Sequence, residues 1–480
     1  GGGAGPSMIV PEWKAALERA AALSTDWLER LPEHRVSPQL DAAAMLREMD
    51  RTLADAPRAP AEVVEELASV AERGLLVSQS GRFFGWVMGG ALPAAVAADW
   101  LTTVWDQNAG SAETPAAAVF EQIVVEWIAE VLGLPAGVSG ALVTGTQMAH
   151  VVCLAAARGH VLDAVGWNVE EDGLSGAPLV HVVAGRERHD TLDRALRFLG
   201  FGTRRTRVVD ADALGRVRPA ALAEVLATCD GPTIVCAQAG NVNGGAMDPM
   251  GAISDLVGSH RARVGDRAVW LYVDGAFGLW ARAAPARAHL LEQVERADSW
   301  ATDAHKWLNT PYDCGVALTR RPEAHRRAMT IHAGYLPAAT DAEVRVPFDW
   351  TPELSRRARG FAAWAALRQL GRSGVAALVE RSCALTRRFA DELARLDGVE
   401  ILHEVALTQI VARFRDPAGR DDDAHTREVV RRVQQEGTCM PSATTWRGVA
   451  AMRVSVSNWS TDEDDVARSV AAIAKAHRGA

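Results

Sequence analysis

Lysine is nearly absent from this chain of 480 residues, which contains only Lys14, Lys306 and Lys475. Arginine replaces it almost everywhere, so a lysine in the middle of the chain invites a chemical reason. An ammonium group loses its proton and attacks a carbonyl to form an imine, whereas a guanidinium stays protonated and cannot. Lys306 is therefore a candidate Schiff-base lysine. The alternative is that a composition biased toward arginine leaves a random lysine there. Only the neighbouring residues distinguish the two.

The sequence also lacks C-x-x-C pairs, long apolar runs and a net positive charge. The six cysteines form no C-x-x-C pair and no zinc or disulfide framework, so we expect no metal site and a reducing cytoplasm as the setting. No apolar run is long enough to span a bilayer, so no membrane partner is expected. The net charge of -9 argues against a nucleic-acid partner, because phosphate neutralisation needs a basic face. No G-x-G-x-x-G follows an early strand, which argues against a nicotinamide-binding protein.

The composition is typical of a soluble globular enzyme with more than one compact unit. Hydrophobic residues make up 48% of the chain and charged residues 23%. We expect residues 8–105 to form a helical N-terminal arm that ends in a pocket loop, the glycine-punctuated aromatic stretch 81–90. Residues 106–370 are expected to form a large domain, and residues 371–480 a small α/β domain.

The large domain alternates between helices and short, buried, β-branched segments. Residues 115–132 form a strongly amphipathic helix, and a second helix ends near Arg158. The alternation predicts a mainly parallel or mixed sheet with helices on both faces. The predicted strands of the large domain are 179–183, 205–210, 233–237, 268–273 and 315–318. Those of the small domain are 399–402, 409–414 and 451–457.

Three groups of polar residues at the ends of these elements suit an imine-forming cofactor. Gly145, Thr146 and Gln147 open a helix, where backbone N–H groups bind a phosphate, although such a turn also serves simply as a helix cap. Asp274 ends a buried strand and would keep a heterocyclic nitrogen protonated, or else caps the next turn. His189 begins a helix and would stack on a flat ring, or else is an ordinary polar residue.

Together with Lys306, these residues resemble the group II pyridoxal-phosphate-dependent amino-acid decarboxylases, the family of aromatic-L-amino-acid and glutamate decarboxylases. The resemblance extends from about Trp13 to the C-terminus. The pieces that carry it are Arg82–Trp86, Gln107-Asn108, Glu121 with Trp127, Thr144–His150, Val273–Ala276, His305-Lys306-Trp307, Pro352–Arg357 and Met452–Ser455. The resemblance implies an α/β fold of fold type I, with a mainly parallel seven-stranded sheet in the large domain.

The resemblance also implies pyridoxal 5'-phosphate as the cofactor and assigns roles to matching positions. Lys306 would form the internal aldimine, Asp274 would pair with the pyridinium nitrogen, and His189 would stack on the ring. Thr146 and Gln147 would hold the phosphate. The matching cofactor-binding positions in this subunit are Gly145, Thr146, Gln147, His189, Asp274, Ala276, His305 and Lys306.

Two further implications concern the partner subunit and the substrate. Members of this family are homodimers that complete each other's sites, so Leu354 and Ser355 of the partner subunit would reach the same phosphate. Phe83, Trp86 and Met88 of the pocket loop would line the substrate pocket, although an aromatic loop of this kind equally often covers the core. They suggest an apolar pocket wall for an amino-acid substrate whose identity the sequence does not reveal.

Tyrosine is as scarce as lysine, since only Tyr272, Tyr312 and Tyr335 occur. Tyr335 matches the family's mobile-loop tyrosine, which protonates the carbon that has lost CO2. A phenol near a closed, dry site is a suitable acid for that step. The alternative is that Tyr335 is a loop aromatic that packs on the surface.

Three positions depart from the family pattern. Gln147 changes the residue type at the phosphate turn, and Asp303 places a carboxylate where some relatives carry Asn. A carboxylate there would repel the phosphate unless it points away or is protonated. The run 240–244 replaces a Gly-Thr-Thr run, and from it we predict that Asn241 or Asn243 contacts the hydroxyl of the cofactor ring.

The predicted function is decarboxylation of an L-amino acid to the amine and CO2 through a Lys306 aldimine and a quinonoid intermediate. The same carbanion also reacts with oxygen to give an aldehyde, or expels a β-substituent such as a thiolate from an S-conjugated cysteine. Relatives that act in natural-product pathways make these outcomes the main alternative. A pyridoxal-free scaffold that keeps the fold is a third hypothesis, which the complete set of Lys306, Asp274 and His189 disfavours.

Overall fold

The large sheet consists of seven strands between residues 139 and 319. The structure is a computed structural model that describes residues 10–331 and 344–479. The strands follow the order β2-β8-β7-β6-β5-β3-β4, in which β8 runs antiparallel to both neighbours and the other pairs are parallel. Their bounds are β2 Ser139–Val143, β3 His181–Gly185, β4 Arg207–Val209, β5 Thr233–Gln238, β6 Val269–Asp274, β7 Ser299–Asp303 and β8 Gly315–Thr319. The predicted mainly parallel seven-stranded α/β domain is confirmed.

Five of these strands lie within two residues of their predicted positions. The strands β2 and β7 are not among the predicted ones. Their sequences, Ser-Gly-Ala-Leu-Val and Ser-Trp-Ala-Thr-Asp, are rich in small and polar residues and poor in the β-branched residues that favour strands. Burial between neighbouring strands therefore decides their conformation.

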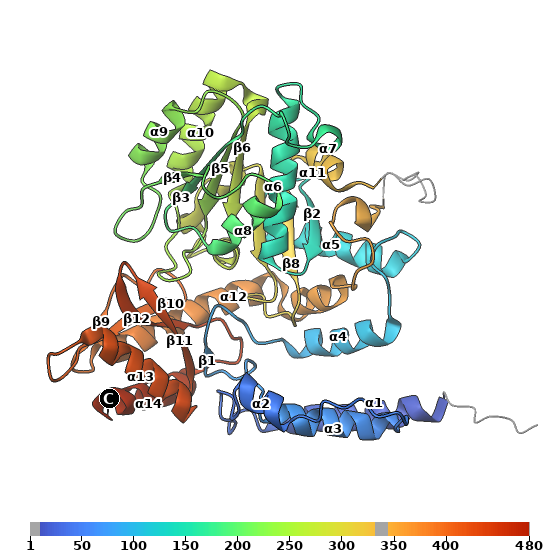
Figure 1. The fold of residues 1–480 in the computed structure, drawn as a ribbon, viewed down its shortest axis with the longest axis vertical. Helices are drawn as coiled ribbons and strands as arrows, with labels where there is room; N and C mark the ends of the chain where they lie inside the picture. Colours follow the sequence, from blue (N-terminus) through green and yellow to red (C-terminus); the bar gives the residue numbers. More distant parts are fainter. Residues whose placement is uncertain (1–9, 332–343, 480) are drawn as a thin grey trace, which may run out of the picture.

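Alternate residues of the central strands enter two separate hydrophobic cores. In β6, Leu271 and Val273 belong to one core, whereas Trp270 and Tyr272 belong to the other. Helices cover both faces, as is usual for parallel strands (Figure 1). The first face packs against α5 Pro115–Val131, α9 Pro219–Ala227 and α10 Met250–Val264, and the second against α6 Thr146–Asp163, α8 Asp190–Phe198 and α11 Pro322–Met329. By the same alternation, the side chain of Asp274 is on the same face of the sheet as Tyr272, the face that α6 and α8 cover.

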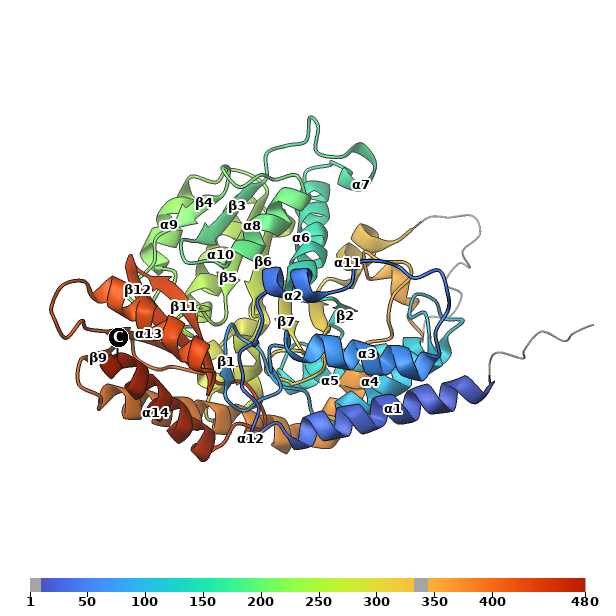
Figure 2. The same ribbon diagram turned by 60° about the horizontal axis from the view of Figure 1, so that its bottom comes forward.

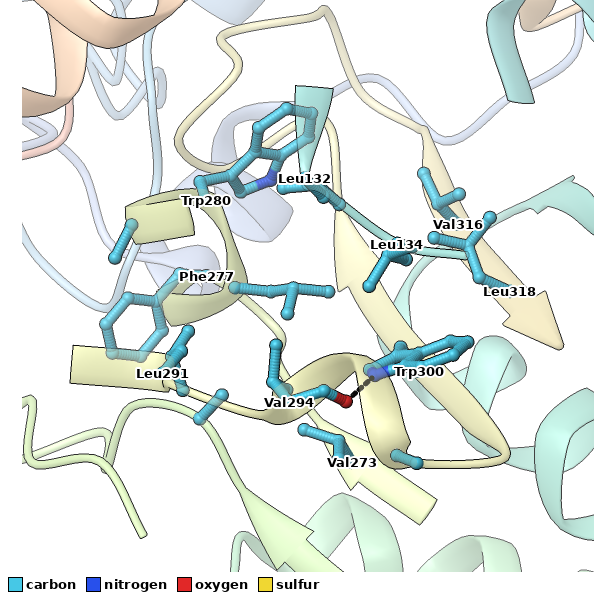
Figure 3. Packing of buried hydrophobic residues seen from close by; sticks show 14 of the residues in the cluster. Leu132, Leu134, Val273, Phe277, Trp280, Leu291, Val294, Trp300, Val316 and Leu318 are labelled. Carbon is cyan, nitrogen blue, oxygen red and sulfur yellow. Dashed lines mark hydrogen bonds between the residues drawn. The ribbon is translucent and has the colours of Figure 1, made fainter. Parts of the chain in front are cut away.

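Aromatic side chains pack among aliphatic ones in the first core (Figure 3). Trp280 and Trp300 are almost completely buried, and Phe277 packs in the same cluster. The indole nitrogen of Trp300 donates a hydrogen bond to the carbonyl of Val294 at 2.9 Å, so this buried polar group is satisfied. Because Phe277 and Trp280 directly follow β6, this packing holds the loop after Asp274 in place.

A second sheet of five strands forms the small domain, in the order β1-β11-β12-β10-β9. Its first strand, β1, is Phe83–Phe84 from the predicted pocket loop, and it pairs in parallel with β11. The other bounds are β9 Val399–Ile401, β10 Gln409–Phe414, β11 Met440–Trp446, β12 Val449–Ser455, α13 Asp422–Glu436 and α14 Glu463–Gly479. Two residues are too few to show a periodic pattern, and the strand that pairs with them lies far along the chain. The sequence therefore predicts a loop where the structure has a strand.

The N-terminal helices lie beside the two domains (Figure 2). The helices α1 Val10–Glu29 and α3 Pro60–Glu72 pack against each other, and α4 Pro93–Trp105 packs against the long helix α12 Gly360–Ala394. The short helix α2 spans Ala42–Glu48. The predicted boundary after residue 370 falls inside α12, where Gly371 interrupts the helix with a φ of 61°.

Three further features of the fold are described for residues 10–331 and 344–479. No helix there is long and apolar enough to cross a membrane. No group of three or more histidine, cysteine, aspartate or glutamate side chains in these ranges is arranged to hold a metal ion. All six cysteines are free and buried.

The buried His325 makes the stability of the fold depend on pH. Its Nδ1 bonds to the Ser139 hydroxyl and its Nε2 donates to the Trp350 carbonyl, both at 2.9 Å, and burial lowers its pKa to about 3. The unfolded chain binds this proton near pH 6.5, so as pH falls from 6.5 toward 3 the unfolded state gains it first and stability is lost. Urea unfolding between pH 7 and pH 4 should show this loss. A His325→Gln variant should show a shallower pH dependence, and an unchanged slope would contradict the assignment.

Candidate active site

A cavity of about 390 Å³ lies at the carboxyl ends of β5, β6 and β7. The last residues of these strands, Gln238, Asp274 and Asp303, line it, as expected for a ligand site on a parallel sheet. The remaining lining residues are Trp86, Val87, Met88, Gly145, Thr146, Gln147, His189, Thr191, Gly240, Val242, Ala276, Phe277, His305, Lys306, Tyr312 and Arg453. Segments from the N-terminal arm, the large domain and the small domain therefore meet in one cavity.

The start of α6 presents a hydroxyl donor without a partner in the described residues, that of Thr146, to this cavity. The helix begins at Thr146, as the Thr-Gly-Thr turn predicts. Within the described ranges, Thr146 Oγ1 and Gln147 Oε1 are buried and have no hydrogen-bond partner, while Gln147 Nε2 donates to the Thr191 carbonyl at 3.2 Å. A Cβ at Gly145 would lie 3.3 Å from the His305 ring, so a larger residue would crowd this turn. The arrangement suits an anion at a helix N-terminus.

Lys306 and Asp303 form an ion pair at the edge of the cavity. Lys306 Nζ lies 2.8 Å from Asp303 Oδ2, and the backbone N–H of Thr146 donates to Asp303 Oδ1 at 2.7 Å. Burial acts to raise the pKa of Asp303, but the charges of Lys306 and His305 and the hydrogen bonds from Lys306 and Thr146 outweigh it, so the pKa is lowered. The carboxylate is thus ionised and paired. Lys306 balances its negative charge. Asp303 therefore need neither point away from a phosphate nor be protonated to avoid repelling it.

His305 is held in one tautomer. Its Nδ1 accepts the backbone N–H of Cys314 at 3.0 Å, so the proton of the neutral ring is on Nε2, which lies 3.5 Å from Asp303 Oδ1. The ring stacks on Tyr312, with centroids 4.2 Å apart. Burial lowers the pKa of His305, so the ring is a neutral donor beside the anion-binding turn.

Asp274 ends β6, Ala276 follows it by two residues, and both line the cavity. The backbone N–H of Ala276 donates to Asp274 Oδ1 at 3.2 Å, and Asp274 Oδ2 lies 3.9 Å from His150 Nε2. The Asp274 side chain is 7% exposed. A carboxylate at this depth that faces a cavity suits a protonated heterocyclic nitrogen.

His189 caps α8 and lines the cavity. Its Nδ1 accepts the backbone N–H of Thr191 at 3.2 Å and lies 2.7 Å from the Thr191 hydroxyl. The ring is accessible to solvent through the open cavity, but the protein on its other sides limits hydration and lowers its pKa. A neutral, flat ring at this position is able to stack on a planar ligand.

Two of the predicted site residues lie elsewhere. Asn241 does not line the cavity: its Oδ1 accepts the backbone N–H groups of Asn243 and Gly244, and its Nδ2 donates to Glu187. This corrects the predicted contact with the cofactor ring, because the amide is used to close its own turn. Phe83 is 2% exposed in β1 and packs behind Trp86, so it supports the cavity wall and does not line it.

Three further predictions stay predictions. Leu354 and Ser355 are exposed and do not line the cavity of their own chain, and the prediction places them in a second subunit. Tyr335 lies outside the described residues. Trp86 and Met88, by contrast, line the cavity as predicted for the pocket loop.

Arg453, on β12, is the most important lining residue without a role in the sequence-based prediction. It is 9% exposed, its Nη1 lies 3.4 Å from Asn243 Oδ1, and its Nε has no partner within the described residues. Burial lowers its pKa. The run Met452–Ser455 carries part of the family resemblance, but an arginine in an arginine-rich chain is not distinctive by itself. Tyr312 also lines the cavity, and the scarcity of tyrosine is a signal that singles it out.

Comparisons with known proteins agree with this site. The pyridoxal-dependent decarboxylase conserved domain matches residues 43–415, so the chain belongs to this family. Tryptophan decarboxylase 1 of Oryza sativa subsp. japonica is 27% identical over 94% of this chain and 91% of that protein. Phenylacetaldehyde synthase of Arabidopsis thaliana is 25% identical over 92% and 91%. A crystal structure of Oryza sativa TDC with PLP and tryptamine covers 99% of both chains at 25% identity, with a TM-score of 0.90.

The chain is therefore a pyridoxal-phosphate-dependent carboxy-lyase of fold type I, related to the group II decarboxylases. The residues present fit the cofactor. The partnerless Thr146 hydroxyl and the start of α6 suit its phosphate, Asp274 suits its ring nitrogen, and Lys306 supplies the amine for its aldehyde.

Proposed function

We propose that this chain removes the carboxylate of an L-amino acid as CO2 and releases the amine. The observation that carries the proposal is that one cavity holds an amine, a carboxylate and a buried guanidinium without a carboxylate partner in the described residues: Lys306, Asp274 and Arg453. An amino-acid substrate has a carboxylate for Arg453 to bind.

Each residue has a distinct task in this reaction. When bound, pyridoxal phosphate supplies an electron sink for the electron pair left behind by CO2. Lys306 would provide the attachment point for the cofactor and an amine for proton transfer near its ring. Asp274 would keep the ring nitrogen of the cofactor protonated, and His189 would cover one face of that ring. Arg453 orients the substrate carboxylate.

The lining of the cavity supports an apolar or aromatic substrate side chain. Trp86, Met88, Val242 and Phe277 contribute apolar surface. Tryptophan decarboxylase 1, named above, acts on an aromatic amino acid by its name, which agrees with this wall. We therefore expect large apolar L-amino acids to be better substrates than acidic ones.

A homodimer completes the proposed site. The exposed Leu354 and Ser355 are available to a second subunit. The exposed apolar side chains Leu67 on α3 and Trp100, Val104 and Trp105 on α4 are available for burial against another copy. Size-exclusion chromatography with light scattering would measure the oligomeric state, and a stable, active monomer would exclude shared sites.

The direct test is a product-resolved assay of the cofactor-loaded protein. A panel of L-amino acids and S-conjugated cysteines would be incubated, with CO2, amine, aldehyde, ammonia and peroxide measured in one reaction. Equal amounts of CO2 and amine are expected from an apolar or aromatic amino acid. If no member of a broad panel released CO2, the proposal would be wrong.

Decarboxylation coupled to oxidative deamination is the second candidate, because an aldehyde synthase is among the relatives. Tyr335 is the proposed proton donor to the carbon that loses CO2. A Tyr335→Phe variant should therefore release less amine and more aldehyde, ammonia and peroxide per CO2. Tyr312→Phe is the matched comparison, and it should leave the ratio of amine to aldehyde unchanged. An unchanged ratio in Tyr335→Phe would refute the role of this phenol.

A further inference from the structure

Four polar side chains form a continuous hydrogen-bonded chain behind the cavity. His189 Nδ1 lies 2.7 Å from the Thr191 hydroxyl, which lies 3.1 Å from His150 Nε2, and His150 Nδ1 bonds to the Tyr272 hydroxyl. His189 and Thr191 begin α8, His150 is on α6, and Tyr272 is on β6. His150 and Tyr272 are fully buried. The chain therefore connects a residue that lines the cavity with the interior of the second core.

The backbone N–H and the hydroxyl of Thr191 together define the direction of the bonds in this hydrogen-bonded chain. The N–H of Thr191 donates to His189 Nδ1 at 3.2 Å, so this nitrogen carries a lone pair and no proton. The Thr191 hydroxyl must then donate its single hydrogen to His189 Nδ1. The same oxygen accepts from His150 Nε2–H, and His150 Nδ1 in turn accepts from the Tyr272 hydroxyl.

The surroundings of the inner end agree with this direction. Burial raises the pKa of Tyr272 well above its ordinary value and lowers the pKa of His150, so the phenol keeps its proton and the imidazole carries only one. Asp274 Oδ2 lies 3.9 Å from His150 Nε2, where an N–H is favourable and a lone pair is not. In the reverse direction, a lone pair on His150 Nε2 would face the Asp274 carboxylate oxygen.

We propose that Tyr272 and His150 are positioning residues that, through the Thr191 hydroxyl, strengthen the preference of His189 for its neutral Nε2–H tautomer beyond what the Thr191 backbone N–H provides. Neither touches the cavity in the lining described above, and both act through Thr191. His189 lines the cavity. Its Nε2–H takes no part in the hydrogen-bonded chain and is therefore free to donate to a ligand. The importance of that tautomer for turnover rests on the proposed function, whereas the tautomer itself does not.

This arrangement prepares the ring before any ligand binds. Partners of a histidine decide which nitrogen carries the proton and how the ring is oriented. With Nδ1 occupied by two donors, the ring neither rotates nor takes up a second proton without breaking the chain. His189 therefore offers a flat neutral face and one donor in a defined direction.

The tautomer is measurable on the full chain loaded with cofactor. Long-range ¹H–¹⁵N correlation spectra of protein labelled with ¹⁵N-histidine distinguish the two nitrogens, and a His189→Gln variant identifies the signals of His189. The parent should show Nε2–H alone. Tyr272→Phe should produce a measurable fraction of Nδ1–H at His189, because His150 then turns its proton toward Nδ1 and the Thr191 hydrogen follows. The same spectrum in Tyr272→Phe as in the parent would overturn the proposal.

A pair of substitutions at Thr191 keeps the test informative if Tyr272→Phe folds poorly. Thr191→Ser keeps the hydroxyl and should keep the parent spectrum, whereas Thr191→Val removes it and should shift His189 toward Nδ1–H. In the decarboxylation assay, Tyr272→Phe should lower kcat by about 10- to 100-fold with a smaller change in KM, as found for groups that orient metal-bound histidines. An unshifted tautomer in Thr191→Val refutes the positioning role. Absence of CO2 release from the parent refutes only the proposed function.

Discussion

Replacing Lys306 with arginine is expected to remove both the covalent attachment of pyridoxal phosphate and nearly all turnover. Arginine keeps the positive charge beside Asp303, which lies 2.8 Å from the Lys306 amine, but it cannot act as a nucleophile toward an aldehyde. A positioned acid-base group alone contributes about 10²- to 10⁴-fold, so kcat should fall by at least that range. Turnover of the cofactor-loaded variant would be compared with that of the parent.

The scarcity of lysine makes the chemical test of this prediction unusually clean. The other lysines, Lys14 and Lys475, are exposed on α1 and α14, outside the cavity. Borohydride reduction followed by peptide mapping should find a pyridoxyl group on Lys306 alone. Lys14→Arg and Lys475→Arg are the matched controls and should keep both label and activity. A label on either of those lysines, or an active Lys306→Arg variant, would contradict the assignment.

Removing the guanidinium of Arg356 is expected to have the largest effect on stability. Arg356 and Glu121 form a buried pair with contacts of 2.6 and 3.1 Å, and their side chains are 1% and 7% exposed. Arg356 also donates to the carbonyls of Ala109 and Leu142, so it joins three segments of the large domain. Arg356→Leu leaves the Glu121 carboxylate buried without its partner, which should destabilise the fold by about 3–5 kcal/mol.

The neighbouring arginine provides the control for this measurement. Arg357 pairs with Asp99 at 2.8 Å, but both side chains are partly exposed, at 38% and 30%. Arg357→Leu should therefore cost less than about 1 kcal/mol. Urea unfolding followed by tryptophan fluorescence would compare the two variants with the parent. Equal losses in both would show that burial of the Arg356 pair does not have the predicted effect.

The sequence predicts the reactive residues of the site better than it predicts their surroundings. Lys306, Asp274 and His189 are recognisable because each has a residue type suited to one chemical task and lies at the end of a helix or strand. All three line the cavity. The direction of the side chains in β6 follows from alternation alone, so the position of Asp274 is predictable from local geometry.

The errors concern residues whose position depends on distant segments. Asn241 is in a turn close to the cavity, and only its bonds to Asn243, Gly244 and Glu187 show that its amide is already used. Phe83 becomes a strand residue because β11 lies beside it.

The motifs of this chain carry its resemblance to the family. Its composition and local patterns indicate the cofactor lysine and the alternation of helices and strands, because these depend on residue type and on neighbours in sequence. The pairing of Asp303 with Lys306, the entry of Arg453 into the cavity and the hydrogen-bonded chain from Tyr272 to His189 depend on the tertiary structure. Each of them requires elements far apart in sequence to meet within hydrogen-bonding distance. Strand order and helix packing, which no local pattern encodes, set those distances.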